Sequence, residues 1–473
     1  MENRKERVPD SLAVVVLAVI VALALWGVFF PGLMSADSIT QYREALTSDY
    51  HDWHPPLMAI VLHAVLRAGG GIGSLMLAQC LAGVFGVLAF SRSVLALVYG
   101  DRLPERRAAW LPLAVLLLLL VPVTPLAFYL MTFWKDAWAM ILMLWVGALA
   151  LDVYRRGPDG KRLFPLIGLA AALAMVRHNA VVLLPLVGWV LWLGARRRMA
   201  RAWALALAAA PLALYLVATP AIDTFFGVVA MHPDSQVMAL DLVGLCARDR
   251  AEGRPVCPRL PWTRAHILDP GALTAYRPGD IGFIFWDKPF HVNPSIRLDY
   301  PRLRSEYLRA VRESPGPLAR VKLAAFKPLL GVHETYYFFH GSIVENPYHL
   351  ALGERLAPVR WNLSTPATWV SQDPAFRWIS GVHLVWLLAN LLAVAGLLVL
   401  RLRRRQERFG FLAWVLLIPL GYYLSYLFAA PAHDFRFMYP STLMIQCAVL
   451  SCGLGGLAQK PTGRAPSLRK FSA

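Results

Sequence analysis

The stretch SLAVVVLAVIVALALWGVFF (residues 11–30) decides the fold class of this chain. It contains no charged side chain, and its length matches the run of about 20 apolar residues that an α-helix needs to cross a bilayer. Similar runs recur along the 473 residues, of which 58% are hydrophobic and 16% are charged. The sequence therefore predicts an all-α polytopic membrane protein rather than a soluble enzyme.

The formal net charge of +18 is concentrated in short clusters of Lys and Arg between the apolar runs. Positive residues of this kind stay on the cytoplasmic side and so orient the helices. Arg4, Lys5 and Arg7 therefore hold the N-terminus inside, and the poor cleavage site FFPGLMSADS (29–38) predicts that the first helix is retained. No basic stripe with interleaved aromatic residues lies outside the apolar runs, so nucleic acid is not an expected partner.

Loop charge also assigns a direction to each apolar run. The run 55–68 has only 14 residues, and if it crossed the membrane the basic stretch 101–107 would lie outside. We therefore expect 55–68 to be a helix that lies at the outer interface. The remaining runs predict a bundle of about ten spans with both termini inside. These spans are 12–31, 73–99, 108–126, 134–152, two short helices within 163–195, 202–220, 382–400, 409–429 and 438–457.

This threading divides the chain into three parts around a cell inner (plasma) membrane. Residues 1–220 form an N-terminal transmembrane module, and residues 382–473 form the last three spans and a basic cytoplasmic tail. Between them, residues 221–381 form a polar exoplasmic segment that is partly surface-helical. Cys246 and Cys257 are the only cysteines of that segment, and the oxidising compartment favours a disulfide over two free thiols.

The first outer loop, residues 32–72, holds the densest group of titratable residues in the chain. Asp37 comes shortly after Pro31 and close to the membrane plane, which makes it the best candidate for a general base on the exoplasmic face. An alternative role for this residue is to N-cap the helix that follows, since Asp is a favoured cap residue. Glu44 and Asp52 are the next candidates for the base.

Two histidines of the same loop, His51 and His54, have H-x-x-H spacing, which leaves a divalent metal open. No convincing third ligand accompanies them, whereas protein zinc sites have three or four protein ligands. No cofactor is therefore expected. The inner loops are also too short to hold a Gly-rich phosphate loop, so the sequence offers no site for a cytosolic nucleotide donor.

Three further outer turns carry cations at the depth of lipid headgroups, where charged groups are costly unless they are paired or used. Cations that converge from different helices predict a clamp for a phosphate or pyrophosphate. The alternative is that each cation snorkels to the interface by itself. The residues concerned are Lys135 and Asp136, Arg177 and His178, and the group His433, Asp434 and Arg436.

A reaction on the outer side would need a donor that arrives in the membrane already activated. Group transfer onto a hydroxyl or an amine requires a base for the acceptor proton and positive charge for the departing phosphate. An outer carboxylate that faces outer cations supplies both requirements.

Four short motifs, taken together and in this order, resemble those of the C-type glycosyltransferases, which have the GT-C fold. The chain is most similar to the protein O-mannosyltransferase and aminoarabinose-transferase type. Phe437 stands where that type usually has Tyr, and the first loop has one Asp rather than an acidic pair, which weakens a metal-dependent mechanism. The motifs are SADSITQY (35–42), HPPL (54–57), MVRHNAVVLLPL (175–186) and HDFRFMYP (433–440), within a similarity that covers residues 12–220 and 382–457.

The resemblance implies a GT-C-like bundle, a polyprenyl-phosphate-linked sugar as donor and inversion at the anomeric carbon. It implies Asp37 as general base, with Lys135, Arg177 and Arg436 near the lipid phosphate. We expect the acceptor to be a glycan, lipid or protein of the cell envelope. The other residues expected to bind substrate are Tyr42, Asp52, His54, Asp136, His178 and Asp434.

Two other functions stay open. A lipid-linked glycan flippase or transporter would be expected to have repeated halves, broken helices and ionisable residues near the bilayer midplane. We find no repeat, and the charges fall at the outer ends of the runs. A glycan polymerase or ligase of similar architecture would transfer a large donor glycan rather than one sugar.

Overall fold

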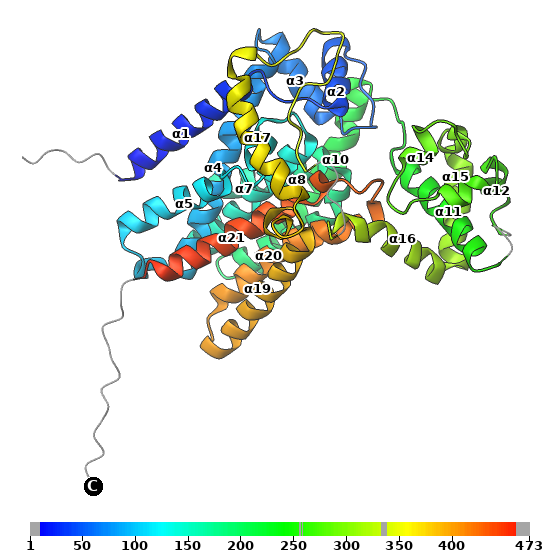
Figure 1. Cartoon of the computed structure of the whole chain (residues 1–473). Helices are drawn as coiled ribbons and strands as arrows, with labels where there is room; N and C mark the ends of the chain where they lie inside the picture. The colour runs from blue at the N-terminus through cyan, green and yellow to red at the C-terminus, as the bar shows by residue number, and fades with distance from the viewer. Residues whose placement is uncertain (1–9, 255–256, 258, 333–337, 460–473) are drawn as a thin grey trace, which may run out of the picture.

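The computed structural model of the protein describes residues 10–254, 257, 259–332 and 338–459 (Figure 1). Over these residues the chain forms helices and isolated β-bridges but no extended strand. Eight helical segments are long and apolar enough to span a membrane, which confirms a helical membrane protein. They are α1 (Asp10–Phe29), α4 (Ile72–Val98), α7 (Lys135–Arg156), η2 with α9 (His178–Ala195), α10 (Arg201–Phe226), α19 (His383–Arg404), α20 (Glu407–Ala429) and α21 (Tyr439–Leu457).

Two of the ten expected spans are not among these eight, and α9, with 12 residues, reaches spanning length only together with η2. α5 (Glu105–Leu119) has 15 residues and α8 (Gly160–Val176) has 17, so both fall below the 18 residues that define a candidate span. Each of the ten expected spans coincides with a helix of the described part of the chain. Eight of the ten have spanning length, with α9 counted together with η2. α10 continues to Phe226, six residues beyond its expected end.

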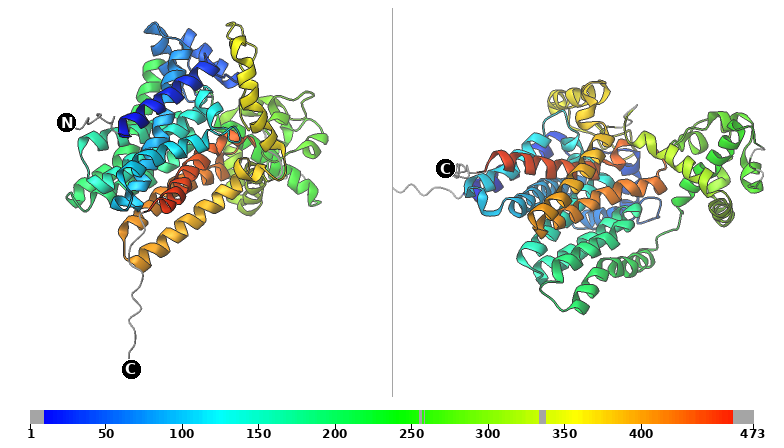
Figure 2. Two further views of the ribbon diagram at one scale, coloured as in Figure 1. Left: turned by 60° about the vertical axis from the view of Figure 1, so that its left-hand side comes forward. Right: turned by 90° about the horizontal axis from the view of Figure 1, so that it is seen from below.

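α7 lies in the interior of the helical bundle and α10 at its edge (Figure 2). Of the most apolar stretch of each helix, 72% is buried in α7 and 6% in α10. α7 packs against α4, α8 and α21, whereas α10 leaves Trp203, Val217 and Phe225 exposed. Exposed apolar side chains in such number mark a surface that contacts lipid.

The turn after α1 positions the loop 32–72. Gly32 has a φ of 127°, and a side chain there would come within 2.5 Å of Met76 Cγ, so only glycine fits. The chain then forms α2 (Ala36–Thr47) and α3 (Leu57–Arg67), the latter at the short helix expected over 55–68. Ser35 is the N-cap residue of α2, so a capping role for Asp37 is wrong, and its carboxylate is left to other partners.

Residues 234–321 form a helical lobe beside the bundle, with a core of its own around Leu242 and Leu303 (Figure 1). Cys246 and Cys257 form a disulfide within it. α15 buries its apolar face in this core instead of presenting it to a membrane surface. The helices of the lobe are α11 (Asp234–Ala251), α12 (Pro261–His266), α13 (Gly271–Ala275), α14 (Gly282–Phe285), η3 (Pro294–Arg297), α15 (Tyr300–Glu313) and the first part of α16 (Pro315–Leu329).

Two helices connect parts of residues 221–381 to the bundle: α16 joins the lobe, and α17 follows it in the chain. α16 packs against α20, and Lys322 Nζ donates a hydrogen bond to Phe428 O at 2.7 Å. α17 (Ala357–Gln372) lies beside α1, where Arg360 donates to Val28 O at 3.0 Å. The remaining short elements are η1 (Gly100–Arg102), α6 (Leu126–Met131), η2 (His178–Leu183), α9 (Leu184–Ala195), η4 (Glu354–Leu356), α18 (Arg377–Ser380) and η5 (Phe435–Phe437).

Candidate functional site

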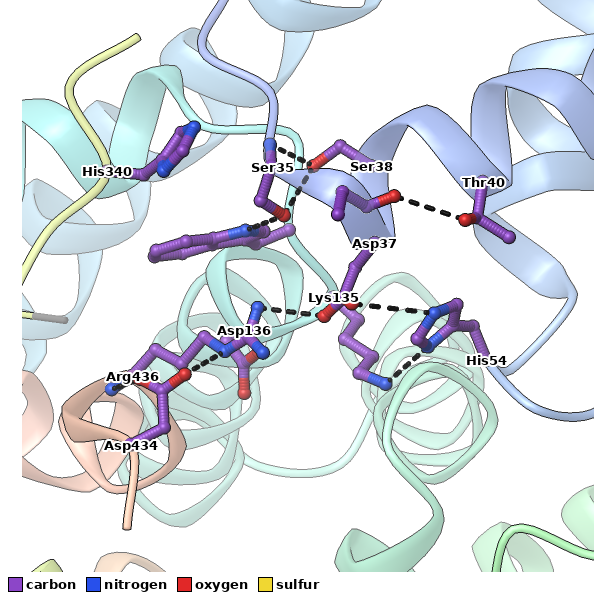
Figure 3. A network of polar contacts seen from close by, with 12 residues as sticks. Ser35, Asp37, Ser38, Thr40, His54, Lys135, Asp136, His340, Asp434 and Arg436 are labelled. Carbon is purple, nitrogen blue, oxygen red and sulfur yellow. Dashed lines mark hydrogen bonds and ion pairs between the residues drawn. The ribbon is translucent and has the colours of Figure 1, made fainter. Parts of the chain in front are cut away.

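Ends of four membrane helices meet at one rim of the bundle and bring together charged residues that are far apart in the sequence (Figure 3). The loop after α1 is held against the segment before α7 by Leu33, whose N–H donates to Met131 O and whose carbonyl accepts from Phe133 N. This contact places the start of α2 beside the start of α7. We call the resulting group the rim cluster: Asp37, His54, Lys135, Asp136, Arg177, Asp434 and Arg436.

Asp37 is the carboxylate of the rim cluster that solvent reaches, with 34% of its side chain exposed. Its Oδ2 lies 2.9 Å from Arg436 Nη1, and its Oδ1 lies 3.8 Å from His54 Nε2. Burial acts to raise the pKa of Asp37, but the charges of Arg436, His54 and Lys135 outweigh it and hold the pKa well below its usual value. The side chain is therefore a carboxylate at physiological pH.

His54 connects Asp37 to Lys135. Its Nδ1 lies 2.9 Å from Lys135 Nζ, and an ammonium group can only donate, so Nδ1 accepts. The ring proton then sits on Nε2, on the side that faces Asp37. Burial and the charge of Lys135 keep the pKa of His54 well below its usual value. His54 is thus a neutral ring that orients Lys135 and leaves Asp37 as the group able to take a proton.

The two arginines of the rim cluster are each backed by a buried carboxylate. Arg177 Nη2 lies 2.5 Å from Asp136 Oδ1, and Arg436 Nε lies 2.7 Å from Asp434 Oδ2. The three cations and three carboxylates of the cluster cancel formally. Among the described residues, Lys135 has no carboxylate within 4.0 Å and is therefore the cation best placed to receive an anionic ligand.

Aromatic rings surround these cations. The Arg177 guanidinium lies 4.8 Å from the centre of the Phe437 ring and 5.9 Å from that of Tyr426. The Arg436 guanidinium lies 5.1 Å from the Trp134 ring. Cation–π contacts of this kind hold a guanidinium plane in one orientation, so the cluster is ordered before any ligand arrives.

Two cavities border the rim cluster. The larger, of about 580 Å³, is lined by Lys135, Arg177 and His178 and by residues of the lobe, and we call it the cleft. The smaller, of about 130 Å³, is lined entirely by apolar side chains. They include Phe133, two residues before Lys135, and Val176, which directly precedes Arg177. The cations therefore lie between a polar cavity and an apolar one.

The other expected site residues take varied positions. Asp52 and His178 line the cleft, and His178 Nε2 lies 3.2 Å from Asp52 O. Asp136 and Asp434 are buried behind their arginines, so they hold cations rather than face a ligand. Tyr42 packs its ring against Tyr348 instead, because five residues after Asp37 an α-helix presents a different face.

Several residues that position the cluster were not expected from the sequence. Trp134 Nε1 donates to Ser35 Oγ at 2.9 Å and so ties α7 to the start of α2. His383, fully buried in α19, contacts Phe435 O at 2.9 Å and Thr442 Oγ1 at 2.7 Å, which fixes the turn that carries Arg436. Two signals in the sequence point to these roles. His383 opens the apolar run of α19, and Trp134 directly precedes Lys135.

Within the described ranges, no three or more His, Cys, Asp or Glu side chains are grouped so as to hold a metal ion. A comparison of the chain with protein-family models, with curated proteins and with solved structures finds no match. The resemblance to GT-C enzymes therefore stays a prediction, and the function has to be inferred from the geometry of the rim cluster.

Proposed function

We propose that this protein is an integral-membrane glycosyltransferase that moves a sugar from a polyprenyl-phosphate carrier to an acceptor on the outer face of the cell membrane. The observation that carries the proposal is the placement of Asp37. It is a partly exposed, ionised carboxylate, 2.9 Å from Arg436 and linked through His54 to Lys135, at the ends of four membrane helices. A base for an acceptor proton and cations for a leaving phosphate thus share one site.

In the proposed reaction the acceptor oxygen forms a bond to the anomeric carbon while the bond from that carbon to the phosphate oxygen breaks. The phosphate leaves with the electron pair, and the acceptor proton passes to Asp37. A carboxylate with a lowered pKa is a weak base, but an attacking hydroxyl becomes strongly acidic as its oxygen bonds to carbon. A single displacement of this kind inverts the anomeric centre.

The cations have a separate task in this mechanism. Lys135 and Arg177 line the cleft, where they can bind the phosphate and stabilise the charge that it gains as it leaves. Arg436 contacts Asp37 directly and keeps the base ionised until the acceptor proton is released. The proposal therefore assigns Lys135 and Arg177 to the donor and Arg436 to the base.

A lipid carrier is supported by the apolar cavity beside the cations. It lies among α3, α4, α7 and α8, and its lining includes Leu57, Trp138 and Val176. Trp138 is one helical turn after Lys135, and Val176 directly precedes Arg177. A chain that enters this cavity would have its first units next to the group that Lys135 binds, as a prenyl chain and its phosphate require.

The test uses the full chain in proteoliposomes with radiolabelled polyprenyl-phosphate hexoses and pentoses and an extract of envelope acceptors. Asp37→Asn is expected to lower transfer by about 10²–10⁴-fold, the range for loss of a general base. Binding of polyprenyl phosphate, measured by native mass spectrometry, should stay near the wild-type level. Asp49→Asn, which removes an exposed carboxylate from the same loop, is the control. Undiminished transfer by Asp37→Asn would overturn the proposal.

A further inference from the structure

The cleft is formed jointly by the bundle and the lobe. The bundle contributes Asp52, Trp53 and His178, and the lobe contributes Gln236 and Tyr307. Its lining includes Lys135 and Arg177 of the rim cluster and Tyr307 of α15, and none of its lining residues also lines the apolar cavity. The lobe therefore forms one wall of the space next to the rim cluster.

Three contacts hold the lobe in place over this space. Asp52 N donates to Val229 O at 3.0 Å, in the segment that leads into the lobe. The Arg297 guanidinium lies 5.1 Å from the centre of the Trp53 ring. Lys322 Nζ donates to Phe428 O at the end of α20. The contacts involve two parts of the bundle, residues 52–53 and the end of α20, so the cleft is already formed without a ligand.

The walls of the cleft combine hydrogen-bonding groups with aromatic rings. Asp52 uses Oδ1 to accept from Met231 N, which leaves Oδ2 for a ligand. Asn179 donates its amide N–H to Ser425 Oγ, which leaves its carbonyl oxygen, and Gln236 adds a second amide. The rings of Trp53 and Tyr307 supply apolar faces. Carboxylate and amide oxygens accept hydroxyl protons, and aromatic faces pack against C–H groups, so this mixture suits a sugar ring.

Other ligand classes fit these walls less well. A lipid tail would leave Asp52 Oδ2 and the Gln236 amide facing apolar groups, which is costly for polar atoms. An extended peptide that binds by strand addition needs the exposed edge of a strand, and the described walls are helices and turns. A volume of about 580 Å³ lies within the range of about 300–1,000 Å³ for pockets that enclose a small molecule.

We propose that the cleft binds a carbohydrate unit of the acceptor and that Asp52, Gln236 and Trp53 recognise it; this inference rests on the proposed glycosyl transfer. The donor phosphate binds at Lys135. The lobe side of the cleft, lined by Gln236 and Tyr307, is then left for the acceptor, because the donor sugar is attached directly to the phosphate at Lys135. The acceptor is accordingly a glycan or glycolipid rather than a protein side chain alone.

The test measures binding of soluble sugars by saturation-transfer NMR, with the full chain in nanodiscs and no donor present. The probes are the methyl glycosides of mannose, glucose, galactose, N-acetylglucosamine and arabinose. At least one probe should give a signal that falls fivefold or more in Gln236→Ala and in Asp52→Asn. Gln372→Ala, an exposed glutamine of α17, is the matched control and should keep the signal. Circular dichroism and thermal unfolding of each variant report whether it is folded.

A second arm separates the acceptor sugar from the donor sugar. Saturating polyprenyl-phosphate-linked sugar should leave the probe signal in place if the cleft serves the acceptor, and should displace the probe if the cleft holds the donor sugar. Displacement, absence of binding by every probe, or unchanged binding in folded Gln236→Ala and Asp52→Asn would each overturn the inference. Binding in the cleft without Asp37-dependent transfer would instead overturn the proposed function alone.

Discussion

Asp37 in the rim cluster and Asp241 in the lobe are both carboxylates that pair with cations, but their surroundings differ. Asp37 keeps 34% of its side chain exposed, and its neighbours include Lys135, which lines the cleft. Asp241 is paired with Lys322, and their side chains are only 2% and 10% exposed. Lys322 also holds the lobe against α20 through Phe428 O.

The difference separates a cation that faces open volume from one that supports the fold. The lobe pair consists of one carboxylate and one ammonium, closed off from solvent. In the rim cluster, Asp136 and Asp434 lie behind their arginines, and Lys135 faces an open cavity. The position of the cation relative to open volume, and not the presence of an ion pair, separates the two cases.

Lys322→Met should give the largest change, because it leaves Asp241 buried without its cation. Removing one partner of a buried ion pair lowers the free energy of unfolding by about 3–5 kcal/mol. Burial raises the pKa of Asp241 to about 6, although Lys322 lies beside it. A folded-state pKa above the unfolded value means that the contribution of this carboxyl to stability is lost as pH rises through 6. The variant should therefore lose more stability at pH 8 than at pH 5, as measured by thermal unfolding in nanodiscs.

The double variant Asp241→Leu with Lys322→Met is the control for this pair. Replacing both charges by apolar groups of similar volume is close to neutral for many buried pairs, so most of the lost stability should return. An equal loss in the single and the double variant would show that Lys322 acts through Phe428 O alone.

Lys135→Met should have the next largest effect, and on transfer rather than on stability. Loss of one group that stabilises a developing oxyanion costs about 10²–10³-fold in rate. Arg177→Met should behave differently, because it leaves Asp136 fully buried and unpaired and so lowers the unfolding temperature as well. Transfer and thermal unfolding are measured for both variants. Together they test whether Lys135 acts on the donor without supporting the fold, whereas Arg177 does both. A stability loss in Lys135→Met as large as that in Arg177→Met would contradict this division of roles.

The sequence predicted the helices and the meeting of Asp37, Lys135, Arg177 and Arg436, because run length and loop charge place all four residues at the same ends of their helices. It did not predict which of these groups face the cleft. Whether Asp136 lies behind Arg177 or beside it depends on side-chain packing between helices, which helical periodicity does not fix. The packing of Tyr42 against Tyr348 was not predicted for the same reason. The lobe wall of the cleft comes from residues about 200 positions after Asp37, and only the folded structure brings them together.

Glu44 shares the first loop with Asp37 but is buried like Asp241, and Glu44→Gln should give the smallest effect of the three. Its side chain is 1% exposed and lies 3.0 Å from His51 Nε2. Burial raises the pKa of Glu44 to about 7, although Arg43 and Lys135 act to lower it. The contribution of Glu44 to stability is therefore fully present below its unfolded pKa, near 4.5, and is lost as pH rises through 7.

Glu44→Gln should match the wild type near pH 4.5 and exceed it by about 2–3 kcal/mol above pH 7.5, because the amide cannot ionise. Thermal unfolding between these pH values measures the difference, with Asp49→Asn as an exposed carboxylate control. Burial also lowers the pKa of His51, so at pH 7 a neutral imidazole faces a carboxyl that is about half protonated. If the Glu44→Gln and wild-type curves ran parallel, Glu44 would be ionised throughout and would belong with Asp37, as a second charged carboxylate of the first loop.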